Sequence, residues 1–227
     1  MKKGFASALA IGLLGILAMP AAAQAMLTYR DRTGHVDIII HIWKEELPSG
    51  AMVHSLMSDG DIHRVENDGS NETISYRFAS PSRNTSYRAH REGNEIMIEG
   101  TLNGSPLSRR LPINATIWME SVEWSLREYA MSGSPRPFLF WVLQPYEVKA
   151  YLLQAIGEPE ENIIVNGHAQ AAARVRVRPT GILAPFWSSL YWFRPSDGRF
   201  MRYEGVRGLP GTPKTVVELI DTGPDSP

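Results

Sequence analysis

The fold is decided by one stretch of the chain, WSSLYWFRPSDGRFMRYEG at residues 187–205. Pro195 presets φ, Asp197 bonds to the local backbone and Gly198 accepts a positive φ, so the centre of the stretch is a turn. The segments on either side are rich in aromatic residues, which strands favour. The stretch therefore predicts a β-hairpin, and its aromatic side chains on both faces require a core on one side and a cover on the other.

Hairpin chemistry continues towards the N-terminus of this stretch. Asn166-Gly167 predicts a tight turn between a strand at 163–165 and one at 170–178. In the second strand two valines alternate with Arg174, Arg176 and Arg178, which indicates a solvated face or, alternatively, an anion-binding row. The apolar residues of 146–156 fit neither the helical nor the strand period cleanly. The segment is interpreted as a strand that ends at a turn over 157–160.

Three further strands follow from composition and alternation. Residues 138–143 form a dense apolar run between prolines, which predicts a strand buried on both faces. Residues 35–43 alternate as a strand does, and residues 215–220 form a last short strand. Between residue 43 and Leu111, turn signals recur about every ten residues, which predicts an antiparallel meander. These signals are Pro48-Ser-Gly50, Asp59-Gly60, Asn67-Asp-Gly69, Pro81-Ser-Arg-Asn84, Glu92-Gly-Asn94 and Asn103-Gly104.

The period of the pattern changes over residues 115–131. Trp118, Val122, Leu126 and Tyr129 lie at spacings of four, four and three, as on the buried side of a helix. Asn114 is a candidate N-cap. The pattern predicts a helix over 115–131, ending near Gly133.

The first 25 residues have the organisation of a signal peptide. Two lysines precede an apolar run from Phe5 to Met19, and Ala23-Gln24-Ala25 supplies a cleavage site, so the mature chain is expected to begin at Met26, with cleavage after Ala23 as the alternative. A run this short is not expected to remain as a membrane anchor. Residues 26–227 suit one antiparallel β domain.

Composition narrows the function classes. The chain has no cysteine, so neither a disulfide framework nor an acylated cysteine is expected, which fits a periplasmic domain. Without residues 1–25 the chain has 21 basic and 24 acidic residues, a net charge of −3. The basic residues are spread along the chain, so no nucleic acid partner is expected.

No catalytic or metal motif is found. The nucleophile elbow, the zinc helix motif and a phosphate-binding loop are all missing from the sequence. His35 and Asp37 share a strand face with His41, but His41 lies roughly 13 Å from His35 at about 3.3 Å per residue, too far for one metal ion. We therefore expect no cofactor, no metal and no enzymatic activity.

An apolar ligand site is the functional interpretation of the aromatic surplus. Ligand sites are mostly apolar clefts, and the helix and late strands supply suitable side chains. The alternative is that the helix itself covers this face as ordinary core. The candidate ligand-binding residues are Trp118, Val122, Trp141, Trp187, Tyr191 and Phe193.

These motifs resemble a known kind of domain. The strand Phe138-Leu-Phe-Trp-Val-Leu-Gln-Pro145 and the hairpin from Tyr191 to Gly205 are similar to uncharacterised periplasmic domains of unknown function, which resemble the LolA-like lipoprotein carriers. The resemblance implies a mainly β fold, an antiparallel incomplete (half) β-barrel wrapped around one or two helices that shelters an acyl chain. It carries over no catalytic residue.

Three function hypotheses follow. The first is an exported, non-enzymatic periplasmic binding or carrier protein for a lipid, an acyl chain or a hydrophobic peptide. The second is a structural or assembly module that pairs with another envelope protein through an exposed strand edge. The third is a hydrolase built on scattered His, Asp and Glu residues.

Overall fold

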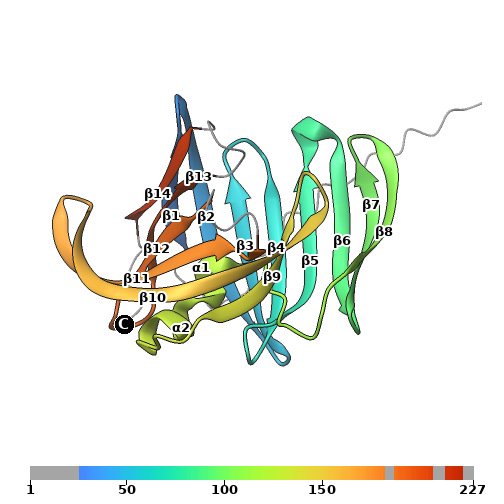
Figure 1. The fold of residues 1–227 in the computed structure, drawn as a ribbon. Helices are drawn as coiled ribbons and strands as arrows, with labels where there is room; N and C mark the ends of the chain where they lie inside the picture. Colours follow the sequence, from blue (N-terminus) through green and yellow to red (C-terminus); the bar gives the residue numbers. More distant parts are fainter. Residues whose placement is uncertain (1–25, 182–186, 207–212, 222–227) are drawn as a thin grey trace, which may run out of the picture.

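One antiparallel sheet forms most of the molecule in the computed structural model, which describes residues 26–181, 187–206 and 213–221 (Figure 1). The predicted signal peptide therefore lies outside the described residues. The strands are β1 Leu27–Thr33, β2 Val36–Leu47, β3 Gly50–Met57, β4 Ile62–Asp68, β5 Thr73–Ser80, β6 Thr85–Glu92, β7 Glu95–Leu102, β8 Ser105–Pro112, β9 Phe138–Gln144, β10 Lys149–Val165, β11 His168–Pro179, β12 Ser189–Phe193, β13 Phe200–Val206 and β14 Lys214–Asp221.

The chain forms two meanders that meet in the middle of the sheet. The strand order is β8-β7-β6-β5-β4-β3-β2-β1-β14-β13-β12-β11-β10-β9, and β1 lies between β2 and β14. Arg30 of β1, for example, stands opposite Ile39 on one side and Glu218 on the other. In the described part of the chain the end strands β8 and β9 do not pair with each other, so the sheet is open. The predicted incomplete antiparallel barrel is confirmed.

The turn residues explain the meander. Each of the six turn signals between residues 48 and 104 includes residues of a connection between two consecutive strands, as predicted. Asn84 and Asn103 have positive φ, a conformation that asparagine tolerates. Asn166 and Gly167 have φ of 52° and 78°, as a primed hairpin turn requires. Gly198 has φ of 69°, and the predicted hairpin is formed by β12 and β13.

The helix predicted over 115–131 is shorter than expected. Residues 115–121 are not helical, and only α1 Val122–Ser125 and α2 Arg127–Met131 follow. Tertiary backbone partners replace the helical bonds: Met119 N donates to Trp141 O at 2.9 Å, and Trp141 N donates to Ile117 O at 2.8 Å. The side chain of Asn114 accepts from Thr116 N at 3.0 Å, which closes a local turn instead of capping a helix.

Two strand predictions are also corrected. The predicted turn at 157–160 is a bulge between Glu158 and Glu161 within the continuous strand β10, because both flanks pair with β11. The strand predicted over 138–143 exists as β9, but it ends the sheet and Leu139 is 40% exposed, so it is not buried on both faces. The pattern analysis did not identify β1.

The core lies on the concave face of the sheet and has two parts. The first core cluster combines side chains of β1, β2 and β10–β14 with α1 and α2; it includes Tyr29, Ile40, Phe193 and Phe200. The second core cluster belongs mainly to β4–β8 and includes Tyr76, Phe78, Ile98 and Trp118. Helix α2 contacts β11 and β12, and both short helices lie inside the curve of the sheet (Figure 1). One or two helices inside the half-barrel were predicted, and this is confirmed.

Candidate functional site

The concave face is covered by a segment that we call the plug, residues 113–131. It leaves β8, passes beside β9 and ends in α1 and α2. Trp118, Met119 and Leu126 are 0%, 1% and 0% exposed. Trp118 belongs to the second core cluster and the next residue, Met119, to the first. The plug therefore joins the two clusters.

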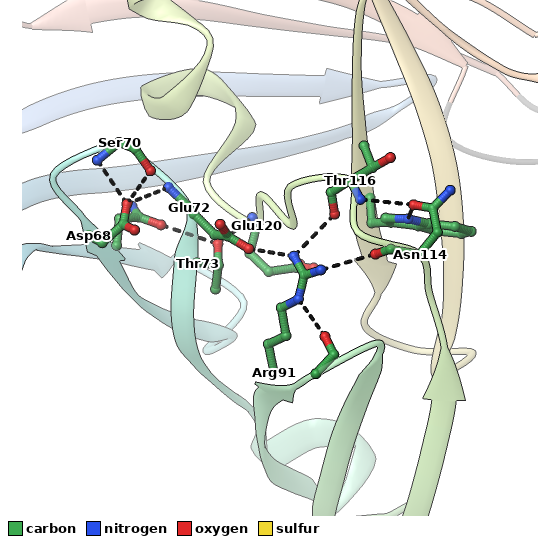
Figure 2. Close-up of polar contacts among 11 residues, drawn as sticks. Asp68, Ser70, Glu72, Thr73, Arg91, Asn114, Thr116 and Glu120 are labelled. Carbon is green, nitrogen blue, oxygen red and sulfur yellow. Dashed lines mark hydrogen bonds and ion pairs between the residues drawn. The ribbon is translucent and has the colours of Figure 1, made fainter.

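Arg91 fixes the first part of the plug to the sheet. Its Nη1 donates to Glu72 Oε1 at 2.5 Å and to Thr116 O at 3.1 Å, and its Nη2 donates to Asn114 O at 3.0 Å (Figure 2). Its Nε donates to Gly93 O at 2.9 Å. Planar guanidinium geometry supplies these donors at once, which an ammonium group cannot match.

A second set of polar contacts fixes the part of the plug directly before α1. Glu120 N donates to Thr73 Oγ1 at 2.9 Å, and Thr73 Oγ1 donates to Asn67 Oδ1 at 3.2 Å. Asn67 Nδ2 donates in turn to Ser121 Oγ at 2.9 Å. Figure 2 also shows the Asp68 carboxylate, which accepts from Ser70 and from the Glu72 amide and so shapes the loop before β5. The plug is thus held by apolar packing and by hydrogen bonds, several of which join the buried side chains of Asn67, Thr73 and Ser121.

Glu120 is the titratable group at this junction. Its Oε1 accepts from Trp118 Nε1 and from Leu143 N, both at 2.5 Å. Burial raises the pKa of the Glu120 carboxyl to about 8, and the two hydrogen bonds oppose this rise only in part. Glu120 is therefore mainly protonated at neutral pH, and it contributes hydrogen bonding without charge.

The six predicted ligand-binding residues fall into both clusters. Trp118 and Trp141 are brought together by a parallel bridge and lie in or against the second cluster. The other four lie in or against the first cluster: Val122, Trp187, Tyr191 and Phe193. Trp118 and Phe193 are fully buried, whereas the other four are half-buried. The six residues therefore belong to two different clusters, and Trp118 and Val122 are part of the plug itself.

Indole groups at the edge of the clusters bind backbone and side-chain acceptors. Trp187 Nε1 donates to Val206 O, and Trp141 Nε1 donates to Asn114 Oδ1 at 2.9 Å. These bonds hold both half-buried rings in place. A ligand that contacts them would meet the apolar ring faces, because the N–H groups already have acceptors.

Several concave-face aromatics were missed by the sequence analysis. Tyr29 of β1 lies 5.3 Å from Phe200 between ring centroids and donates its hydroxyl to Phe200 O at 3.0 Å. The ring centroids of Tyr203 and Tyr191 lie 5.0 Å apart. The polar sequence around Tyr29 hides its strand, and only the alternation of Tyr29 with its neighbours could have identified it.

Two of the three arginines on the predicted arginine face of β11 are neutralised by ion pairs. Arg174 Nε lies 2.7 Å from Glu158 Oε2 and its Nη1 lies 2.9 Å from Glu161 Oε1, while Arg176 Nε lies 2.5 Å from Glu158 Oε1. Arg178 donates to the Gln154 amide oxygen. Two interpretations of this row were left open, a solvated face and an anion-binding row. The ion pairs do not favour anion binding, because they already engage Arg174 and Arg176.

A small hollow lies between α2 and the bulge of β10. Its volume is about 270 Å³, and its wall includes Tyr129, Pro135, Glu160 and the paired Glu158 and Arg174. Tyr129 accepts a hydrogen bond from Gly157 N at 2.9 Å. The hollow is lined by polar and apolar surface alike, so it does not have the lining of a lipid site.

Two searches of the described residues concern other functions. None of the described helices has the length and apolar character to cross a bilayer. Within the same described ranges, no group of three or more His, Cys, Asp or Glu side chains is placed to hold a metal ion.

Comparison with known proteins identifies the fold. No protein-family model and no curated protein matches the chain. The crystal structure of a β-barrel-like protein of the domain of unknown function DUF1849 from Brucella abortus is similar over 87% of this chain and 96% of its own, with 8% identity and a TM-score of 0.58.

Two more distant structures were also found. The hypothetical lipoprotein YmcC from Escherichia coli has 10% identity, coverage of 90% and 92%, and a TM-score of 0.47. A LolA superfamily protein from Nitrosomonas europaea has 10% identity, coverage of 90% and 86%, and a TM-score of 0.30. The predicted resemblance to proteins of unknown function is confirmed at the level of the fold: the chain shares the β-barrel-like architecture of the DUF1849 protein.

Proposed function

We propose that the chain is an exported periplasmic protein that binds an apolar ligand on the concave face of its sheet and catalyses no reaction. The ligand classes are a lipid, an acyl chain or a hydrophobic peptide. The observation that supports this most is the way the concave face is covered. Its apolar wall is closed by a plug whose helices have only four and five residues, not by a second sheet or a long helix.

A small displacement of the plug would expose apolar surface on both sides of it. The hydrogen bonds from Arg91 to Thr116 and Asn114 lie at partly exposed positions, where water can replace them at a cost of about 1 kcal/mol each. The centre of the plug is apolar, so an acyl chain could take over the contacts of Leu126 and Met119 without leaving a void. The proposed ligand-contacting residues are those predicted from the sequence: Trp118, Val122, Trp141, Trp187, Tyr191 and Phe193.

Export supports a periplasmic place for this activity. The pattern of residues 1–25 is that of a cleaved signal peptide, and a cysteine-free domain of this size fits that compartment. The mature chain would begin at Met26.

Native mass spectrometry of protein purified from the periplasm tests the proposal. We expect a species heavier than the chain from Met26 by the mass of a lipid or peptide, released by organic solvent. A matched pair of variants locates the site: Tyr191→Ser on the concave face should lower occupancy, and Ile164→Ser, at a 60% exposed position of β10 outside both clusters, should not. A chain that is bare in every preparation would contradict ligand carriage.

One observation favours a second function. Strand β8 pairs with β7 on one side, and among the described residues no strand pairs with its other side. An envelope protein could add a strand there, although Pro106 and Pro112 remove two amide donors from β8. Cross-linking in intact cells should then recover a partner through β8, and recovery of the monomer alone would remove this function.

A further inference from the structure

The convex face of the sheet carries a line of arginines that we call the arginine row: Arg64 of β4, Arg77 of β5 and Arg88 of β6. Arg64 stands directly opposite Arg77, and Arg77 stands directly opposite Arg88. Neighbouring strands lie about 4.8 Å apart, so the three residues span about 10 Å across the sheet. Their chain neighbours Val65, Tyr76 and Ala89 are buried in the core, so the arginines point outwards.

The row is not neutralised as other arginines of this sheet are. On β11 and β13, Arg174, Arg176 and Arg202 are paired with acids of their own or adjacent strands; Arg202, for instance, pairs with Glu204 and Glu218. In the row, Arg88 lies 2.8 Å from Glu99. Arg64 and Arg77 have no carboxylate within ion-pair distance among the residues that the structure describes. Like charges in direct cross-strand register destabilise a sheet, so a counter-anion would relieve this repulsion.

The acids nearest in sequence and register are already engaged. Glu66, two residues beyond Arg64 on the same face, accepts from Ser49 at one oxygen and from Ser75 at the other. Glu45, on β2, lies 3.4 Å from His54 Nε2. The row therefore has unneutralised charge at its centre and acids only at its flanks.

An apolar row runs beside the arginine row. Leu56, Ile62 and Ala79 are successive cross-strand partners on β3, β4 and β5, and Leu56 is 38% exposed. At the end of the arginine row the Trp43 ring stacks on His54 with a centroid distance of 4.8 Å. Basic, apolar and tryptophan side chains therefore share one outer surface, a composition typical of proteins that rest on a membrane interface.

We infer that the arginine row is a docking site for the phosphate groups of an anionic membrane surface, with Leu56 and Ile62 resting against the interface beside it. Guanidinium groups bind phosphate oxygens through paired N–H donors. Strands β4–β6 are hydrogen-bonded on both sides, so this face offers no free strand edge for a peptide. The inference stands apart from the proposed function, because it requires neither an apolar ligand nor movement of the plug.

Vesicle co-sedimentation tests this inference with protein purified after expression of the full sequence. We expect binding to vesicles of equal parts phosphatidylglycerol and phosphatidylcholine, weak binding to phosphatidylcholine alone, and weaker binding as salt is added. The double variant Arg64→Gln, Arg77→Gln should bind roughly tenfold or more weakly. Leu56→Asn should also weaken binding at unchanged charge.

A matched control separates the site from net charge. Arg30→Gln with Arg136→Gln removes the same charge from exposed positions outside the row and should leave vesicle binding intact. Equal loss in both double variants, or equal binding to neutral and anionic vesicles, would overturn the inference. Two other outcomes would also overturn it: full competition by millimolar inorganic phosphate, which indicates a free-anion site, and binding to polyglutamate without binding to vesicles, which indicates an acidic protein partner.

Discussion

The carboxyl group of Glu120 connects the plug to β9 through one oxygen atom. That oxygen accepts from the Trp118 indole and the Leu143 amide, and burial raises the pKa of the carboxyl to about 8. In the unfolded chain the Glu120 carboxyl has its ordinary pKa of 4.5. Between these two pKa values the folded state holds more protons, so the free energy of unfolding decreases as the pH rises through this range.

Glu120→Gln should remove this pH dependence. The amide oxygen of glutamine can accept the same two hydrogen bonds but cannot lose a proton. We expect the unmodified protein to lose on the order of a few kcal/mol between about pH 5 and pH 8, and the variant to keep a flatter profile. Urea unfolding across this range measures both, with Glu128→Gln on the exposed side of α2 as the control. Parallel profiles for all three proteins would show that Glu120 does not titrate in this window.

Gly100 illustrates a position where only glycine fits. Its φ is +149°, and a Cβ atom there would lie 2.3 Å from Ser86 O and 2.6 Å from Tyr87 Cα. Gly100→Ala should therefore reduce the free energy of unfolding by on the order of 3 kcal/mol. Gly93 also has positive φ, +59°, but open space around it, so Gly93→Ala should cost about 1 kcal/mol. Chemical denaturation compares them, and equal losses would exclude the steric explanation.

At the scale of elements, turns were predictable and the plug was not. Asn103-Gly104 and Asn166-Gly167 determine their own backbone geometry locally, so their positions follow from sequence. The spacing of apolar residues over 115–131 also fits a helix when only local sequence is considered. What prevents the helix is a distant backbone, since Trp141 offers hydrogen bonds to Ile117 and Met119. No local pattern contains that information.

Arg91→Lys tests whether polar contacts hold the plug. Lysine keeps the charge but cannot reproduce bonds to Glu72, Thr116, Asn114 and Gly93 together. We expect a loss of about 2 kcal/mol in the free energy of unfolding and faster amide hydrogen exchange over 113–121. Arg110 forms an exposed ion pair, with its Nη1 3.7 Å from Glu95 Oε2. Arg110→Lys should change neither the free energy of unfolding nor the exchange rates. Unchanged exchange in the Arg91 variant would show that apolar packing alone fixes the plug.

At the scale of the whole molecule, the decisive contact joins the two ends of the described chain. Strand β1 pairs with β14, and this pair lies in the middle of the sheet. The sequence identified aromatic residues of the right kind for the concave face, but it could not assign them to separate clusters. That division depends on where the plug crosses the sheet, and Trp118 and Met119, adjacent in sequence, face different clusters.

This architecture predicts a single cooperative unfolding transition for residues 26–221. Strand β3, which pairs with β2 of the first cluster and β4 of the second, and the plug both connect the two clusters, so neither cluster should persist without the other. Val217 in the first cluster and Val65 in the second are 4% and 3% exposed, which makes them a matched pair. Val217→Ala and Val65→Ala should each reduce the free energy of unfolding by about 2 kcal/mol. Each should therefore lower the midpoint temperature of the one calorimetric transition. If each substitution moved a different transition, the two clusters would be separate folding units joined only by strand pairing through β3.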